Sequence, residues 1–145
     1  MIKSILVVCV GNICRSPMAQ YLISREVCGV TVVSAGLHAV IGSAPDPMAT
    51  RVAGEAGLDI ASHRAQQLNV ELVRSADLIL AMEAAHKHKI MRQHPGASGK
   101  VFRIGEIGRF DVPDPYGKSL EHFHDAYELI RIGIGAWVPR IKAMA

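Results

Sequence analysis

The sequence predicts an α/β fold in which a parallel sheet carries helices on both faces. Short apolar segments rich in β-branched residues alternate with longer segments whose apolar residues recur at helical spacing. The strand-like segments are apolar at nearly every position, which is typical of parallel strands buried on both faces. Half of the 145 residues are hydrophobic, enough for a substantial core. We therefore expect a single domain over residues 1–145.

Four segments are predicted to be strands. Residues 5–9 form a continuous apolar run, and residues 30–35 are again β-branched. Residues 76–82 predict the third strand and residues 100–104 the fourth. Residues 61–68 have no clear preference for helix or strand.

The predicted helices begin at residues suited to a helix start. Ser16 and Pro17 suit the N-cap and the first position of the first helix, which stops near Gly29. Further helices are expected over residues 48–56 after Asp46 and Pro47, from Asn69 to about Ser75, over residues 83–94, and from Ser119 into the apolar C-terminal segment. Two glycines, Gly133 and Gly135, are expected to weaken this last helix locally.

The junction of the first strand and first helix is the most informative segment, with the sequence CVGNICRSP over residues 9–17. In parallel sheets, ligands sit beyond the carboxyl ends of the strands, where a loop feeds a helix N-terminus. Gly11 and Asn12 tolerate left-handed backbone angles, which let successive N–H groups turn inward. Arg15 adds a planar fork that can grip two oxygens. The segment therefore predicts a site for a tetrahedral dianion such as a phosphoryl group.

Cys9 is the candidate nucleophile of this site. The thiolate is the reactive form of cysteine, and a helix N-terminus and a nearby guanidinium both favour it. The Ser16 hydroxyl can donate a further hydrogen bond to the sulfur. The alternative is a buried core cysteine beside a surface Arg15, but the spacing of cysteine, arginine and helix start argues against it.

A cysteine nucleophile needs a proton donor for the leaving oxygen, and Asp114 is the first candidate. It lies between Pro113 and Pro115, which stiffen the loop and bias Asp114 to an extended backbone. Asp111 is the competing acid on the sequence alone. A plain turn with no chemical role is the other interpretation of this segment.

Together these residues resemble the low-molecular-weight protein tyrosine phosphatases, in the bacterial branch associated with exopolysaccharide and capsule export. The resemblance rests on residues 8–17 with Asp114-Pro115-Tyr116 downstream, and it extends through residues 34–37, 44–47, 62–67 and 77–83. It implies a three-layer α/β/α fold with a four-stranded parallel sheet of order 2-1-3-4, which is flavodoxin-like or phosphotyrosine phosphatase I-like.

The resemblance also implies a role for each site residue. Cys9 would attack phosphorus and form a phosphocysteine, Arg15 and the loop amides would hold the phosphoryl oxygens, and Asp114 would protonate the tyrosine oxygen. The remaining implied residues are Val10, Gly11, Asn12, Ile13, Cys14 and Ser16 in the phosphate-binding loop, His63 in the supporting network, Val40 and Tyr116 as walls for the substrate ring, and Cys14 as the redox partner of Cys9. No metal or cofactor is implied.

The implied substrate is a phosphotyrosine protein, which in that branch is a membrane tyrosine autokinase regulating exopolysaccharide or capsule production. We expect a cytoplasmic location without membrane insertion, because residues 1–4 lead straight into a strand and no apolar run approaches the ~20 residues that span a bilayer. The net charge of +3 comes without a block of like charges, so no nucleic-acid partner is expected. A monomer or weak self-association is expected.

Two other functions compete with this interpretation. Arsenate reduction on the same loop needs further cysteines as an electron relay, and no cysteine follows Cys28. A non-catalytic phosphotyrosine-binding module would be favoured by replacement of Cys9 or Asp114, and both are present. A metal site is not expected, since His86 and His88 stand two apart on a helix and no HExxH or paired CxxC motif occurs.

Overall fold

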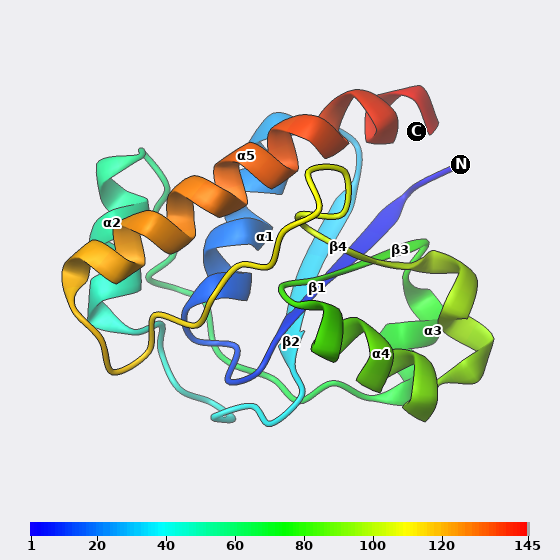
Figure 1. Ribbon diagram of the computed structural model, residues 1–145, viewed down its shortest axis with the longest axis horizontal. Helices are drawn as coiled ribbons and strands as arrows, with labels where there is room; N and C mark the ends of the chain where they lie inside the picture. The colour runs from blue at the N-terminus through cyan, green and yellow to red at the C-terminus, as the bar shows by residue number, and fades with distance from the viewer. Residues whose placement is uncertain (145) are drawn as a thin grey trace.

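A four-stranded parallel sheet lies between two layers of helices in the computed structural model, which describes residues 1–144 (Figure 1). The strands are β1 (Ser4–Cys9), β2 (Thr31–Gly36), β3 (Leu78–Ala81) and β4 (Val101–Arg103). Their order is β2-β1-β3-β4 and every neighbouring pair is parallel. The predicted fold class and strand order are confirmed.

Strand β3 is shorter than the strand predicted over residues 76–82, because Asp77 bonds to the start of β1 through its side chain. The Asp77 carboxylate accepts hydrogen bonds from the backbone N–H groups of Lys3 and Ser4, at 2.8 and 3.1 Å. Asp77 therefore binds the start of β1 through its side chain, and ladder pairing begins at Leu78.

The helices begin and end close to the predicted residues, with one informative exception. They are α1 (Arg15–Glu26), α2 (Pro47–Glu55), α3 (Val70–Ser75), α4 (Ala84–Gln93) and α5 (Leu120–Met144), with a 3₁₀ helix, η1 (Pro95–Lys100), after α4. The predicted caps at Asp46 and Asn69 are confirmed, since their side chains accept hydrogen bonds from Met48 N and Leu72 N. Within residues 1–144, none of these helices is both long and apolar enough to cross a membrane.

The exception is Ser16, whose prediction as the N-cap of the first helix is wrong. Helix α1 begins at Arg15 after Cys14, and no side chain caps it. The Ser16 hydroxyl instead faces the end of β1, where its oxygen lies 2.9 Å from Cys9 Sγ. The first N–H groups of α1 are thus left without a side-chain partner at the loop that follows Cys9.

The ambiguous residues 61–68 form an extended, irregular segment that runs beside the end of β2. Its one ladder contact is a parallel bridge between Gln67 and Gly36. Gly36 is required there, because a side-chain carbon on it would collide with the carbonyl oxygen of Val10. Residues 61–68 reach the same loop after β1 through His63 and Gln66, which hydrogen-bond to Asn12.

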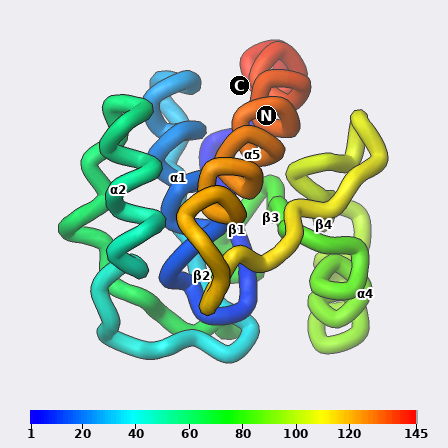
Figure 2. Tube along the Cα trace, turned by 60° about the vertical axis from the view of Figure 1, so that its left-hand side comes forward, coloured from blue at the N-terminus to red at the C-terminus, as the bar shows by residue number. Residues whose placement is uncertain are grey.

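Two hydrophobic clusters hold the layers together, one on each face of the sheet. Alternate residues of β1 point to opposite faces, so Ile5 and Val7 join one cluster while Leu6 and Val8 join the other. The first cluster includes α1, α2 and α5, and the second includes α3 and α4. Figure 2 shows α1 and α2 on one side of the sheet and α4 on the other.

Helix α5 seats on the end of β4 through a glycine and a tryptophan. A side-chain carbon on Gly133 would lie 2.5 Å from Ile104 Cγ2 and 2.7 Å from the Ile104 carbonyl oxygen. One turn later, the Trp137 indole N–H donates to the carbonyls of Arg103 and Ile104. Gly135, by contrast, has open space around it. Both glycines were expected to weaken the helix, but only Gly133 is needed for packing against residue 104.

We predict that Gly133→Ala lowers the free energy of unfolding by about 1–3 kcal/mol, because the new methyl group must displace backbone atoms of residue 104. The matched control, Gly135→Ala, should raise it by up to about 1 kcal/mol, since alanine favours helix and nothing obstructs it. Urea denaturation of both variants measures the difference. Equal stabilisation by both would contradict the close packing at Gly133.

Candidate active site

The loop after β1 lies at the carboxyl end of the sheet, where three segments meet. Residues 9–15, 37–46 and 110–118 converge at this end of the molecule in two views (Figures 1 and 2). Between them is a pocket of about 220 Å³. Its lining comprises Cys9, Val10, Gly11, Ile13, Cys14, Arg15, His38, Val40, Asp114 and Tyr116. Most of the residues predicted for the site are therefore brought together here.

The carbonyl groups of the loop are turned away from the pocket. Each accepts a hydrogen bond from a neighbouring segment, mainly from backbone N–H groups of residues 37–46. The donors are Leu37 N to Cys9 O, His38 N to Val10 O, Val40 N to Gly11 O, His63 Nε2 to Asn12 O and Asp46 N to Ile13 O, at 2.8–3.0 Å. Because the carbonyls are engaged outside, the loop N–H groups are left to the pocket side, as an anion site requires.

Asn12 organises the loop from behind the pocket rather than lining it. It is fully buried, with the left-handed φ of 59° expected from the sequence. Gln66 N donates to Asn12 Oδ1, which identifies the other side-chain atom as the nitrogen. That nitrogen donates to Ser16 Oγ and Ser34 Oγ, at 2.8 and 2.9 Å.

This network gives the Ser16 hydroxyl a direction. Since Ser16 Oγ already accepts from Asn12, its own proton is available for Cys9 Sγ, 2.9 Å away. A hydroxyl that donates to sulfur favours the thiolate over the thiol. The contact expected from the sequence is present, and the orientation of its proton follows from the Asn12 amide.

His63 lies in the same network, as the sequence interpretation expected. Its side chain is buried, and Nε2 lies 2.8 Å from the Asn12 carbonyl oxygen, to which it donates. Burial lowers the pKa of His63; the Asn12 carbonyl opposes this shift and the Arg64 charge adds to it. A neutral His63 still carries the Nε2 proton that holds the loop.

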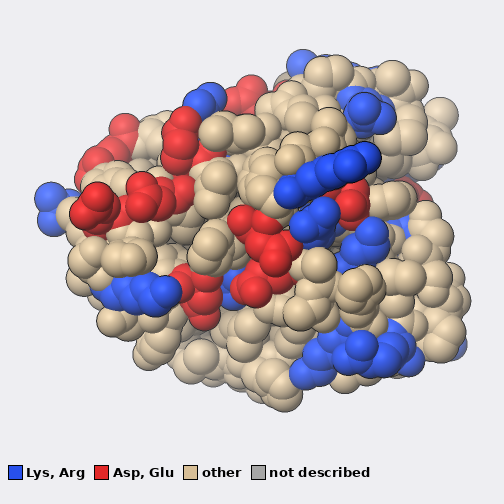
Figure 3. All heavy atoms as spheres, viewed as in Figure 1, with Lys and Arg blue, Asp and Glu red and all other residues tan. Residues whose placement is uncertain are grey.

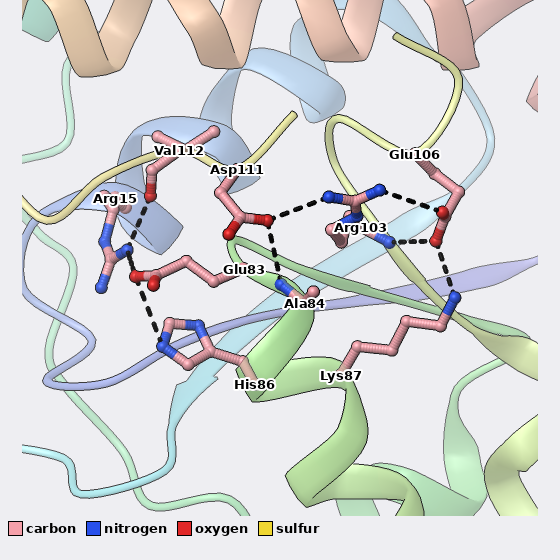
Figure 4. A network of polar contacts seen from close by, with 9 residues as sticks. All are labelled: Arg15, Glu83, Ala84, His86, Lys87, Arg103, Glu106, Asp111 and Val112. Carbon is pink, nitrogen blue, oxygen red and sulfur yellow. Dashed lines mark hydrogen bonds and ion pairs between the residues drawn. The ribbon is translucent and has the colours of Figure 1, made fainter. Parts of the chain in front are cut away.

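Arg15 is almost completely buried, 1 % exposed, and its guanidinium joins three segments (Figure 4). Nη1 donates to Glu83 Oε2 at 2.6 Å and to the Val112 carbonyl at 2.8 Å. Nη2 lies 3.7 Å from Asp114 Oδ2. One nitrogen is thus committed to the protein, and the other lies beside the carboxylate that lines the pocket.

The structure separates the two candidate acids. Asp114 lines the pocket with one half-exposed carboxylate, whose Oδ1 accepts from Tyr116 N at 3.0 Å. Asp111 is not among the lining residues. It accepts from Ala84 N at the start of α4 and pairs with Arg103, both at 3.0 Å (Figure 4). Asp111 therefore fastens its loop to α4, and Asp114 is the acid that can reach a bound group.

Polar contacts continue from this loop across the start of α4. Arg103 pairs with Glu106, which also pairs with Lys87 at 2.8 Å. Figure 3 shows acidic side chains near the middle of this face with basic ones beside them.

His86 lies next to Glu83, with His86 Nε2 3.5 Å from Glu83 Oε2. The buried Nδ1 of His86 has no hydrogen-bond partner among the described residues. Burial lowers the pKa of His86, which Glu83 opposes.

Cys14 is buried in the pocket wall together with Cys9. Burial raises the pKa of the Cys14 thiol, and the nearby charges of Asp46, Cys9 and Asp114 raise it further. Cys14 is therefore a thiol at neutral pH. The redox role expected for it stays a prediction.

Sequence reasoning missed two residues that matter to the site. Glu83 has no role in the interpretation of the sequence, yet it is the ion partner of Arg15. It follows β3, the neighbour of β1, so the rule that sites gather at the carboxyl ends of adjacent strands could have found it. His38 lines the pocket and its ring nitrogen lies 2.9 Å from Lys89 Nζ. No local pattern marks His38.

Comparisons with known proteins agree with this geometry. The family profile described as "Low molecular weight phosphotyrosine protein phosphatase" matches residues 4–145. A "Probable low molecular weight protein-tyrosine-phosphatase EpsP" of Ralstonia nicotianae is 54% identical over 144 residues, covering 99% of both chains. The structure of Vibrio vulnificus Wzb in complex with benzylphosphonate superposes with a TM-score of 0.93 at 42% identity, covering 97% of this chain and 99% of that one.

A related structure carries a different activity in its name. The YwlE arginine phosphatase from Geobacillus stearothermophilus is 34% identical with a TM-score of 0.91, covering 98% of this chain and 94% of that one. The fold is thus shared by phosphatases with chemically different substrates. Among residues 1–144, no three His, Cys, Asp or Glu side chains gather in a way that could hold a metal ion.

We predict that Glu83→Gln lowers the free energy of unfolding by about 1–3 kcal/mol, because it removes the charge of the carboxylate nearest to the buried Arg15 guanidinium. Glu106→Gln is the matched control in the same network, since Glu83 and Glu106 are similarly exposed at 30% and 27%. Its partners Lys87 and Arg103 are both partly exposed, so the loss should stay under about 1 kcal/mol. Urea titrations at neutral pH compare the two. A greater loss in Glu106→Gln would show that Arg15 does not depend on Glu83.

Proposed function

We propose that this chain, which belongs to the low molecular weight phosphotyrosine protein phosphatase family, hydrolyses phosphotyrosine with Cys9 as nucleophile, Arg15 as anion clamp and Asp114 as acid and base. The observation that carries these assignments is the meeting of all three residues in one pocket at the N-terminus of α1. Family membership supports a protein-tyrosine-phosphatase activity, and the geometry supports the residue roles.

In the first step, the Cys9 thiolate attacks phosphorus while the bond from phosphorus to the tyrosine oxygen breaks. The loop N–H groups and the free side of the Arg15 guanidinium hold the remaining phosphoryl oxygens, whose charge redistributes in the transition state. Asp114 donates its proton to the departing phenolic oxygen. The products are a dephosphorylated tyrosine side chain on the substrate protein and a phosphocysteine on Cys9.

In the second step, water attacks the phosphocysteine and the bond between sulfur and phosphorus breaks. Asp114, now a carboxylate, takes a proton from the water, so that it returns to its acid form as inorganic phosphate leaves. The Ser16 hydroxyl favours sulfur as the leaving group, because its proton is directed at Cys9 Sγ. No metal takes part in either step.

The pocket walls favour an aryl phosphate over phosphoarginine. Val10, Ile13, Val40 and Tyr116 present apolar side chains around the buried Cys9, which suits the faces of a phenyl ring. A phosphoarginine side chain would need polar partners for its guanidino N–H groups. The carboxylate in this wall is Asp114, and it cannot pair with a guanidino group while it serves as the acid and base of the reaction. Phosphotyrosine is therefore the substrate that the lining fits.

The cellular substrate we propose is a membrane tyrosine autokinase that controls exopolysaccharide or capsule production, met in the cytoplasm. The resemblance to the polysaccharide-associated branch and the 54% identity to EpsP support this partner. A monomer, or a weakly self-associating one, suffices, because every residue assigned to the reaction comes from one chain. Loss of tyrosine phosphorylation on a co-expressed autokinase, absent when Cys9→Ser replaces the wild type, tests the partner.

The nucleophile assignment predicts that Cys9→Ser abolishes hydrolysis of phenyl phosphate. A serine hydroxyl is a much weaker acid than a thiol, so it does not supply the anionic nucleophile that the reaction needs. Phosphate release measured in the presence of a chelator checks it. Full activity in Cys9→Ser, or activity that requires an added metal, would overturn the proposed function.

The acid assignment predicts that Asp114→Asn slows hydrolysis of phenyl phosphate by ~10²–10⁴-fold. The loss should be smaller with p-nitrophenyl phosphate, because nitrophenolate leaves without a proton. Asp111→Asn is the isosteric control and should keep most activity with both substrates. If only Asp111→Asn shows the dependence on leaving group, the acid is Asp111 instead.

A further inference from the structure

Exposed apolar side chains line the pocket or lie in the segments that carry its lining residues. Val40 is 48% exposed, Ile41 73%, Met48 39% and Tyr116 61%. These four are among nine large exposed hydrophobic residues in the described chain, and they come from two loops and the start of α2. Exposed apolar side chains gathered beside a binding pocket mark a surface that another molecule covers.

A second hollow of about 400 Å³ adjoins the pocket on the α2 side. Its lining includes Asp46, Pro47, Met48, Tyr116, Lys118 and Phe123. Tyr116 lines both hollows, so the two are neighbours that share this residue. A molecule seated in the first pocket can therefore extend past Tyr116 into the second without leaving the surface.

The second hollow is rigidly connected to the anion loop. Asp46 N donates to the Ile13 carbonyl at 2.8 Å, which joins its edge to the loop. The Asp46 side chain caps α2 by accepting from Met48 N, also at 2.8 Å. Phe123, almost fully buried at the start of α5, forms part of its lining. A subsite built on such fixed elements adds affinity without an ordering cost.

We propose that this hollow is a subsite for an apolar side chain two residues from the phosphotyrosine of the substrate protein. The proposal rests on the proposed function, since it needs phosphotyrosine in the first pocket. Along an extended segment, a side chain two residues away lies about 7 Å from the tyrosine and points to the same face, so it can reach past Tyr116. Asp46 and Lys118 give the hollow one charge of each sign, so neither an acidic nor a basic side chain is favoured over an apolar one.

The first measurement uses phosphotyrosyl peptides whose flanking residues are all alanine, compared with peptides carrying a single leucine at one of the two positions on either side. We expect leucine at one of the positions two residues away to raise kcat/KM by roughly threefold to tenfold, as burial of a few methylene groups does. Leucine at an adjacent position should have little effect. Most of the gain should come as a lower KM, because the contact is present in both the ground state and the transition state.

The second measurement repeats this comparison with Met48→Ala, which removes an apolar wall of the hollow and no residue assigned to the reaction. The preference for leucine should fall toward one, while kcat/KM for phenyl phosphate stays unchanged. Ile132→Ala is the matched control, since Ile132 is also exposed, at 48%, on helix α5 outside this hollow. It should keep the leucine preference of the wild type.

A flat leucine profile in the wild type, or a preference that Met48→Ala leaves intact, overturns the subsite. So does a Met48-dependent dimer in sedimentation, because the hollow would then be covered by a second copy of the chain. Hydrolysis of phenyl phosphate separates the two levels of inference. If it persists in either case, only the subsite fails; if the wild type does not hydrolyse it, the proposed function fails as well.

Discussion

The buried guanidinium of Arg15 is the contact on which the arrangement of the site depends. A charge that is 1% exposed is costly unless it is paired and hydrogen-bonded, and two separate segments meet this need. Glu83 follows β3, while the Val112 carbonyl and Asp114 belong to the loop before α5. Satisfying one side chain therefore places the candidate acid, the end of the sheet and the start of α1 around a single pocket.

The second constraint is the demand for hydrogen bonds by a loop that turns sharply behind the pocket. Its carbonyls are satisfied by residues 37–46 and His63, and Asn12 uses both ends of its amide inside the protein. These bonds leave the N–H groups and the Ser16 proton for the pocket. The polar groups that could bind an anion are thus those that are not used in hydrogen bonds within the fold.

The apolar surface beside the pocket is held by the same segments that hold the reacting groups. Tyr116 extends from the loop that carries Asp114, and Met48 from the helix whose N-cap, Asp46, is bonded to the anion loop. Elements that position the reacting groups thereby also position the surface that a protein substrate would meet. In the proposed mode of binding, the same hydrogen bonds position both the surface that recognises the peptide and the groups that react with its phosphoryl group.

The sequence by itself determined what depends on local chemistry. Apolar runs marked the strands, Asp46 and Asn69 marked helix starts, and the spacing of Cys9 and Arg15 marked an anion loop, because each needs only neighbours in the chain. Tertiary structure alone decided what depends on distant partners. Ser16 is not a cap because Asn12 and Cys9 engage its hydroxyl, and Gly133 is required because Ile104 lies against it. Asp114 rather than Asp111 lines the pocket, since Ala84 and Arg103 hold Asp111 elsewhere. Such choices are made by contacts between residues far apart in sequence, which no local pattern encodes.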